Sequence, residues 1–514
     1  VLGIKQVGIR DNFFALGGNS IITMRLVNRI EAETGVRIAL SEVFVRRTPE
    51  EIAPLIAHEE SMYQEIPIVD GRETYLMSSP QKRLYMLWEM DSNSTAYNLP
   101  QGFYIYGDID ENKMREALYE LVLRHEILRT GFQVENGELV QKINETVEID
   151  FVTETSEEDA EHLLSEFVQP FDLHTPPLMR AKLIRQEEGC LLLLDIHHII
   201  CDGTSLSKME QELGDIYNGS TKRHCSRQYK DYSEWMHTRN LESQKMYWES
   251  EYSEEIPVLS LPLDYTRPQE QSYEGNRVYV SISEDLKRSL RKLSQKTGTT
   301  EYMIYLSAAM ILLGKYSYQE DIVVGSPISG RVHRDTEDMH GMFVNTLVIR
   351  GRPEKRKSYL EFLEEIKQTC LRAYENQEYP FEELIETIGA NRDLSHNPMF
   401  DVMVVMQERE TVGLSLKGKK VLEIPQATRT SKFDLTIEIG EKENGESIIS
   451  FEYCTALFKR QSIERMLNHY IEVLKRISNK PTVKLLEIEV ASAEERKQIL
   501  EEFNDTAAEY PRER

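Results

Sequence analysis

The chain has 514 residues and a formal net charge of -26, with 40% hydrophobic and 29% charged residues. This length predicts about two to four compact units, and the negative charge argues against nucleic acid as a partner. No apolar run is long enough to span a membrane, and the five cysteines, odd in number and widely spaced, are expected to be reduced thiols in a cytoplasmic protein.

Residues 1–57 predict a small helical unit. A helix is expected over residues 20–34, where apolar residues recur on one stripe, and Thr48-Pro-Glu-Glu51 is typical of another helix start. Ser20 stands where the first helix begins, and serine is a favoured helix cap. A serine hydroxyl beside free helix amides is also a suitable site for a phosphate group.

Periodicity fades over residues 58–72, which predicts a linker. The rest predicts an α/β body of two lobes, with a proline-containing crossing over residues 251–275. A hairpin is expected from residues 178–184 and 190–196 in the first lobe. In the second lobe we expect a helix over 300–316, a strand over 322–324, a hairpin from 435–439 and 448–453 with an Asn444-Gly445 turn, and a helix over 460–477.

The apolar run Leu191–Leu194 predicts a buried strand that ends at two histidines, His197 and His198. Asp202 and Gly203 follow, and then a helix over residues 204–217. Because neighbouring side chains of a strand point to opposite faces, one histidine can face a cleft while the other packs inside. A neutral imidazole can take a proton from an attacking amine and return it.

Other interpretations of this stretch remain open. A single buried histidine is more often a hydrogen-bonded core residue than a catalytic one. A metal site is weakly supported, because adjacent histidines on opposite faces do not chelate one ion well. Cys201 has no neighbour that would activate its thiol and is expected to pack. His125, beside Arg124 and Glu126, is expected to brace a helix end.

His197-His-Ile-Ile-Cys-Asp-Gly203 resembles the signature of condensation domains of nonribosomal peptide synthetases, which share their fold with chloramphenicol acetyltransferase-like enzymes. Phe13-Phe-Ala-Leu-Gly-Gly-Asn-Ser20 resembles the attachment motif of peptidyl carrier proteins. The overall chain resembles a piece of a tyrocidine-type synthetase. The other stretches that resemble condensation motifs are residues 78–87, 124–132, 229–235, 340–346, 377–383 and 392–399.

The resemblance implies a small all-α four-helix carrier bundle followed by an α/β two-lobed condensation domain, a V-shaped pseudo-dimer of chloramphenicol acetyltransferase-like lobes. The implied segments are a carrier domain (1–57), a linker (58–72), an N-terminal lobe (73–250), a C-terminal lobe (251–480) and the start of a linker to a downstream adenylation domain (481–514).

The implied reaction is peptide-bond formation in a tunnel between the lobes. The amine of an acceptor aminoacyl thioester attacks a donor thioester, and the carrier holds the donor on phosphopantetheine attached to Ser20. The resemblance assigns His198 to the acceptor amine and makes the Gly203 amide a candidate oxyanion donor. No metal is implied.

Four further residues are implied to support the site. His197 packs, and Arg331 is the candidate partner of Asp202, since a buried carboxylate needs one. Asn345 either lines the channel or holds a turn.

The implied partners are an upstream adenylation domain, downstream adenylation and carrier domains, and a phosphopantetheinyl transferase, with the chain itself a monomer. Three alternatives remain: an epimerisation domain, a non-catalytic recruitment domain of the same fold, and a stand-alone acyltransferase using coenzyme A.

Overall fold

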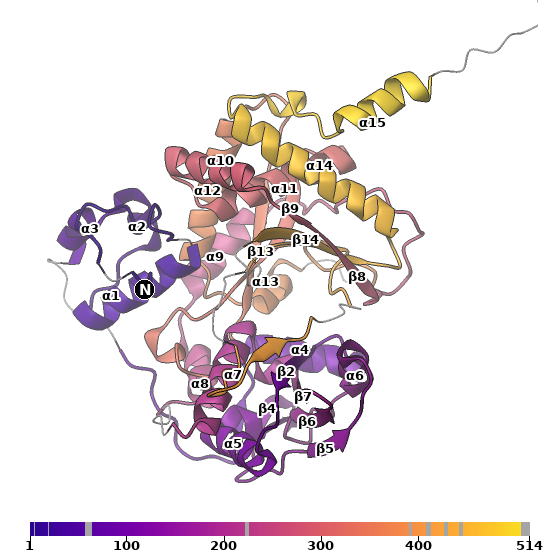
Figure 1. The fold of residues 1–514 in the computed structure, drawn as a ribbon. Coiled ribbons are helices and arrows are strands. Elements are labelled where there is room, and N and C mark those ends of the chain that lie inside the picture. Colours follow the sequence, from indigo (N-terminus) through magenta and orange to yellow (C-terminus); the bar gives the residue numbers. More distant parts are fainter. Residues whose placement is uncertain are drawn as a thin grey trace, which may run out of the picture.

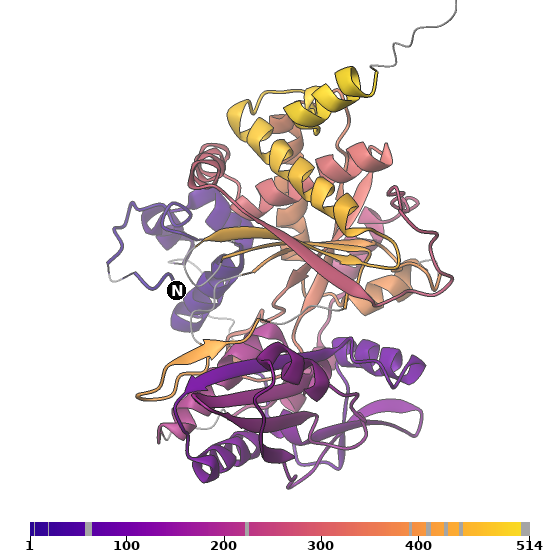
Figure 2. The same ribbon diagram turned by 45° about the vertical axis from the view of Figure 1, so that its right-hand side comes forward.

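The computed structural model describes residues 1–4, 6–18, 20–56, 64–220, 226–389, 393–407, 413–425, 430–441 and 446–504. Three bodies follow one another along the chain: a small helical unit, a lower lobe and an upper lobe (Figure 1). The helical unit lies beside the upper lobe, and a loop with one strand descends from the upper lobe to the lower one (Figure 2).

The N-terminal unit contains three helices within the described chain, α1 (Ser20–Thr34), α2 (Leu40–Arg46) and α3 (Pro49–Ile56). The predicted bounds of α1 are confirmed, whereas α2 was not predicted. The described residues contain three of the four helices expected for this unit, and residues 1–4 and 6–18 form extended segments and turns. Two of their glycines, Gly3 and Gly17, have positive φ angles, which helices do not contain.

The helical unit shares a core with the upper lobe. Phe13, Val43 and Phe44 are buried in the same apolar cluster as that lobe's sheet. Polar contacts add to this interface: Asn28 Nδ2 donates to the carbonyl of Arg331 at 3.1 Å, and Arg37 donates to that of Val332 at 3.3 Å.

The described part of the linker is attached to the body. Ile66 is fully buried, and its N–H donates to Asp335 Oδ2 at 2.8 Å. The N–H of Val69 donates to Asp231 Oδ1 at 2.9 Å. Residues 64–72 therefore follow the surface of the body instead of spanning open solvent.

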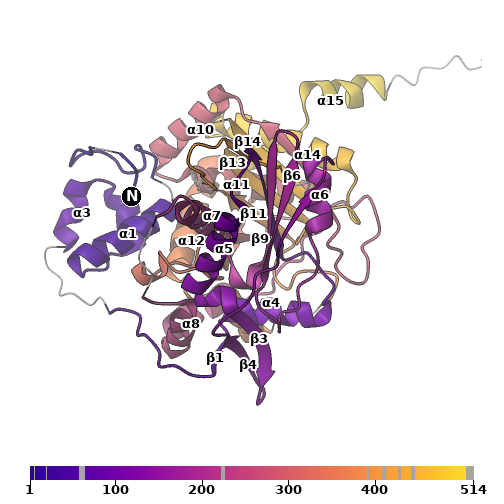
Figure 3. The same cartoon turned by 60° about the horizontal axis from the view of Figure 1, so that its bottom comes forward.

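The first lobe is built on a five-stranded sheet of order β12-β2-β7-β6-β5. β7 (Gly189–His197) lies at its centre and is buried along its whole length, because helices cover both faces. Leu192 and Leu194 pack in the cluster that contains α5 and α7, while Leu191 and Leu193 pack against α6 on the other face (Figure 3). The remaining elements of this sheet and its helices are β2 (Asn98–Tyr106), β5 (Phe151–Thr155), β6 (Met179–Gln186), β12 (Val421–Glu423), α5 (Glu111–Arg124), α6 (Ala160–Phe167) and α7 (Gly203–Tyr217).

A three-stranded sheet and two helices complete the first lobe. The sheet has the order β1-β4-β3, and Ser78 caps α4 in a reciprocal capping box with Gln81. The bounds are β1 (Thr74–Leu76), β3 (Thr130–Glu135), β4 (Glu138–Ile143), α4 (Ser79–Met90) and α8 (Tyr229–Thr238).

The second lobe is built on a six-stranded sheet of order β10-β9-β11-β13-β14-β8. Its strands are β8 (Gly275–Ser281), β9 (Ile322–Ile328), β10 (Asn345–Gly351), β11 (Val402–Met406), β13 (Leu435–Glu441) and β14 (Ser447–Cys454). Its helices are α9 (Glu242–Glu251), α10 (Glu284–Thr297), α11 (Glu301–Ser317), α12 (Tyr359–Glu375), α13 (Phe381–Ile388), α14 (Arg460–Asn479) and the short α15 (Ala493–Lys497). The predicted 435–453 hairpin forms, and its Asn444-Gly445 turn lies outside the described residues.

Three segments depart from the expected division. β12 pairs with β2 of the first lobe, although residues 421–423 were assigned to the second. Trp248 of α9, assigned to the first lobe, is buried in the core of the second. Leu485 and Ile488, expected in a linker, are also buried there. Among the described helices, none combines the length and apolar character needed to cross a membrane.

Candidate active site

His197 and His198 occupy different environments at the end of β7. His197 is buried, and its Nδ1 accepts the N–H of Ile199 at 3.1 Å. His198 begins a short 3-10 turn (His198–Ile200), and its N–H donates to the carbonyl of Tyr97 at 2.8 Å. The chain turns between the two residues, so that His197 is buried whereas His198, as a whole residue, is partly exposed.

His198 is half-buried as a whole residue, but its Nδ1 is buried and has no hydrogen-bond partner among the described residues. The exposure therefore belongs to the rest of the residue. Burial, and then the charge of Lys432, lower the pKa of His198 to about 4. Burial, and then the charges of His198 and Lys432, lower the pKa of His197 to about 3. Both rings are neutral near pH 7, and a neutral imidazole can accept a proton.

Asp202 and Arg331 form a buried ion pair at 3.2 Å. Asp202 caps α7: its Oδ1 accepts the N–H of Ser205 at 2.7 Å and its Oδ2 that of Phe343 at 3.1 Å. Although burial acts to raise the pKa of Asp202, the charge of Arg331 and the hydrogen bonds outweigh it and lower the pKa. The pair thus fixes the first turn of α7 against the segment that precedes β10.

Asn345 uses its whole side-chain amide to hold one loop. Its Nδ2 donates to the carbonyls of Gln377 and Tyr379, both at 2.9 Å. Its Oδ1 accepts the N–H of Phe381 at 3.0 Å and that of Thr346 at 2.8 Å. These bonds favour the turn-holding alternative, although Asn345 also lines a cavity.

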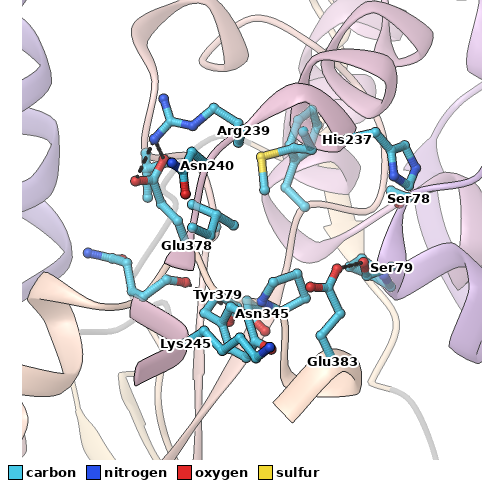
Figure 4. Close-up of a pocket in the computed structure, with 18 of the residues that line it drawn as sticks. Ser78, Ser79, His237, Arg239, Asn240, Lys245, Asn345, Glu378, Tyr379 and Glu383 are labelled. Atoms are coloured by element: carbon cyan, nitrogen blue, oxygen red, sulfur yellow. Dashed lines mark hydrogen bonds and ion pairs between the residues drawn. The ribbon is translucent and has the colours of Figure 1, made fainter. Parts of the chain in front are cut away.

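This cavity of 570 Å³ lies between the lobes (Figure 4). Around its rim, Arg239 pairs with Glu378 at 2.9 Å, and Ser79 donates to Glu383 at 3.0 Å. His198 and Gly203 are not among its lining residues. A channel that opens His198 to two sides therefore stays a prediction.

Gly203 is the first residue of α7, so its N–H is one of the amides that a helix leaves without an internal partner. It is exposed, and no atom lies within 4 Å of the position that a Cβ would take. The protein itself does not require glycine here for space. A small side chain therefore fits at this position without a clash.

Three of the stretches singled out in the sequence have structural roles. Cys201 is fully buried, and burial raises the pKa of its thiol well above the usual value. Tyr229 is buried and shares a 2.7 Å hydrogen bond with Ser78. His125 lies at the end of α5 and bonds Glu212 at 2.7 Å, in the polar network expected at that helix end.

Ser20 is placed only by its backbone, which begins α1; its side chain lies outside the described residues. The loop before it, Phe14–Gly18, lines a cleft of 370 Å³ with Lys287, Arg291 and Tyr305 of the upper lobe. Lys287 pairs with Glu441 and Arg291 with Glu301, both at 3.1 Å, so the feature that suits an attached phosphate is the helix N-terminus.

A condensation-domain family model matches residues 71–500. The chain belongs to the condensation-domain family. Residues 1–56 match the phosphopantetheine attachment-site family, so the condensation domain follows a carrier unit that bears this cofactor covalently. Condensation domains are the amide-forming acyltransferases of nonribosomal peptide synthesis.

The relatives of this condensation domain are large synthetases. The chain is 44% identical over 520 residues to gramicidin S synthase 2 of Brevibacillus brevis, covering 99% of this chain and 12% of that protein. It is 40% identical to tyrocidine synthase 2 of Brevibacillus parabrevis, covering 100% of this chain and 14% of that protein. The chain therefore spans a small part of the synthetases it matches.

Two solved structures share the fold. The X-domain from teicoplanin biosynthesis aligns with a TM-score of 0.77 at 20% identity, covering 83% of this chain and 100% of that one. A four-domain nonribosomal peptide synthetase solved with AMP and glycine aligns with a TM-score of 0.76 at 22% identity, covering 85% of this chain and 35% of that one. The predicted two-lobed condensation fold is confirmed.

Two substitutions test the Gly203 amide of the condensation domain. Gly203→Pro removes the N–H. The fold should accept this change, because proline is tolerated at the first position of a helix and the extended backbone of Asp202 (φ -105°, ψ 175°) suits a following proline. Gly203→Ala adds a side-chain carbon but keeps the N–H. If the N–H donates to an oxyanion, the proline variant should be slower than the alanine variant by about 10²–10³-fold in kcat.

Both Gly203 variants should unfold at temperatures close to the wild-type value. Equal kcat values for the two variants would contradict an oxyanion role of this amide.

Lys432 is a residue of the condensation domain that sequence reasoning missed. Its Nζ lies 4.8 Å from the centre of the Tyr97 ring, and the Tyr97 carbonyl accepts the N–H of His198. Burial lowers the pKa of Lys432 to about 8, so it is still largely charged near pH 7. No motif or spacing in the sequence connects it with the histidines.

Replacing Lys432 with methionine should raise the pKa of His198, because a nearby positive charge disfavours the imidazolium. In the wild type, activity should fall only as the pH approaches about 4, where His198 becomes protonated. This acidic limb should move to higher pH in Lys432→Met, which the pH profile of kcat/KM measures.

Lys420→Met is the matched control for Lys432. Lys420 lies over the ring of Tyr106, at one end of β2. His197 pairs with Asn98 at the other end of that strand. An acidic limb that shifts equally in both variants would contradict a local effect of Lys432.

Proposed function

We propose that this chain forms a peptide bond between two carrier-bound substrates. The N-terminal carrier holds the donor on phosphopantetheine at Ser20, and the amine of an acceptor aminoacyl thioester attacks the donor. One observation supports the proposal most. A neutral, half-buried His198 lies at the end of a buried strand and close in sequence to the exposed Gly203. Both residues belong to a condensation domain that is fused to a carrier.

Phosphopantetheine, when attached, supplies the thiol that holds the donor as a thioester. His198 takes a proton from the attacking amine or orients it, and a proton returns to the leaving sulfur. The Gly203 N–H donates to the carbonyl oxygen while that oxygen carries negative charge. Asp202 and Arg331 keep Gly203 in place by fixing the first turn of α7. His197 and Asn345 position the two loops on which the site depends.

The proposed segments are a carrier at 1–57, a linker at 58–72, and lobes at 73–250 and 251–480, with Trp248, Leu485 and Ile488 also packed in the core of the second lobe. β12 would then belong by sequence to the second lobe and by pairing to the first. The proposed partners are adenylation domains on both sides, a downstream carrier and a phosphopantetheinyl transferase. We place this monomeric chain in the cytoplasm.

The attachment site is tested by intact-protein mass after treatment with a phosphopantetheinyl transferase and coenzyme A. The wild-type chain should gain the mass of one phosphopantetheine, and Ser20→Ala should gain none. Ser41→Ala, which changes a serine of α2 in the same unit, should still be loaded. Loading of Ser20→Ala would contradict the assignment of Ser20.

The configuration of the loaded aminoacyl group distinguishes peptide-bond formation from epimerisation. An aminoacyl group loaded on the chain should keep its configuration and leave as part of a dipeptide. Racemisation of that group on the chain, with no amide formed, would instead show an epimerisation domain.

A further inference from the structure

Three side chains from distant parts of the chain meet beside α7. His125 follows α5, Glu212 lies within α7, and His340 lies between β9 and β10. The Nε2 atoms of His125 and His340 lie 2.7 and 3.4 Å from the same oxygen, Glu212 Oε2. The two rings are 4.0 Å apart between centroids at an angle of 68°, and the three ligand atoms lie within 4.8 Å of one another.

The hydrogen bonds of His340 do not balance for a neutral ring. Its Nδ1 lies 3.3 Å from the carbonyl oxygen of Ser205, and its Nε2 lies 3.4 Å from Glu212. Both partners are acceptors, whereas a neutral imidazole has a single N–H. A neutral ring can therefore donate to only one of these two oxygens, in a side chain that is 3% exposed. A cation between Nε2 and the carboxylate would remove this conflict.

We propose that His125, Glu212 and His340 bind a divalent transition-metal ion of the Zn²⁺ class. Two imidazoles and one carboxylate are a common ligand set for such ions. The Nδ1–H of His340 would then donate to the Ser205 carbonyl and fix the ring, as metal-bound histidines usually require. Arg124 holds the other carboxylate oxygen, Glu212 Oε1, at 3.1 Å.

The position of this site gives the ion a structural role. His125 and Glu212 belong to the first lobe, whereas His340 lies in the segment that joins strands of the second lobe. The same segment is already held at the first lobe, because Ser205 Oγ donates to the carbonyl of Gly341 at 2.9 Å and accepts its N–H at 3.0 Å. A bound ion would fasten this segment to α7 and raise the unfolding temperature of the full chain.

The test uses the full chain, stripped with a chelator and titrated with Co²⁺ and then with Zn²⁺ in competition. We expect one tightly bound equivalent, visible in the Co²⁺ d–d absorption, and a higher unfolding temperature with Zn²⁺. His340→Gln should weaken binding by at least about tenfold. His162→Gln should not, although His162, with Glu158 and Glu166, forms a second, exposed cluster of possible ligands on and beside α6.

Unchanged affinity in His340→Gln, or a loss in His162→Gln, would overturn the proposal. X-ray absorption at the zinc edge of the wild-type chain gives a result that does not depend on any variant. Two imidazoles with oxygen ligands would support the site, and sulfur ligands would overturn it. If no equivalent binds, a proton on His340 balances its hydrogen bonds and the proposal fails.

Discussion

Replacing His198 with alanine is expected to slow peptide-bond formation by about 10²–10⁴-fold, the usual contribution of a positioned general base. The neutral ring is the only group in the account that handles the proton of the attacking amine. The rate is measured under single-turnover conditions with a loaded donor and a saturating acceptor. These conditions separate the chemical step from loading and product release.

The fold of His198→Ala should be retained, since the residue is half-buried and its Nδ1 makes no hydrogen bond to any described residue. His197→Ala is the matched variant one residue earlier. There the substitution leaves the N–H of Ile199 without its acceptor, so the free energy of unfolding should fall by about 1–3 kcal/mol. Wild-type rates in a folded His198→Ala protein would refute the assigned role.

Replacing Arg331 with alanine is expected to lower the free energy of unfolding by about 3–5 kcal/mol, because Asp202 would keep a buried charge without its partner. The guanidinium also donates to the carbonyl of Met339 at 2.8 Å and to Ser205 Oγ at 2.7 Å, and these bonds would be lost too. Urea denaturation followed by circular dichroism measures the change.

Arg352→Ala is the control for Arg331. Arg352 pairs with Glu254 at 2.7 Å, but the two side chains are 50% and 70% exposed, so its loss should cost less than about 1 kcal/mol. If Arg331→Ala and Arg352→Ala had the same free energy of unfolding, the buried pair would not contribute the stability assigned to it.

The Asp202–Arg331 pair should also make the stability of the chain depend on pH. Because the pKa of Asp202 is lowered in the folded chain, its contribution to stability is present above the pKa of an unfolded carboxyl, about 4. That contribution is lost as the pH falls through the folded-state value. The stability difference between the wild type and Arg331→Ala should therefore shrink in acid.

Local patterns predicted much of the fold. The apolar stripe of α1 gave its bounds, and the apolar run Leu191–Leu194 lies in the buried strand β7 as expected. The hairpin of β6 and β7 follows from two apolar segments on either side of a short turn. These features depend on residues close together in the chain, so their spacing carries the information.

Local sequence patterns did not predict the contacts between segments that are distant in the chain. β12 is a short strand that pairs with β2 across the lobes, and its three residues do not indicate which strand it pairs with. The positions of Lys432 beside Tyr97 and of His340 beside Glu212 likewise appear only once the lobes are assembled. The pairing of Asp202 with Arg331 was anticipated only through the family resemblance.

The central claim is that this chain joins its own donor to an external amine. It is tested most directly by loading Ser20 with a labelled aminoacyl group, adding an aminoacyl acceptor carrier, and following the label by mass in a single turnover. We predict that the label leaves the chain and reappears in an amide-linked dipeptide on the acceptor. Release of the label only as the free amino acid, with no dipeptide formed by the wild-type chain, would contradict the account.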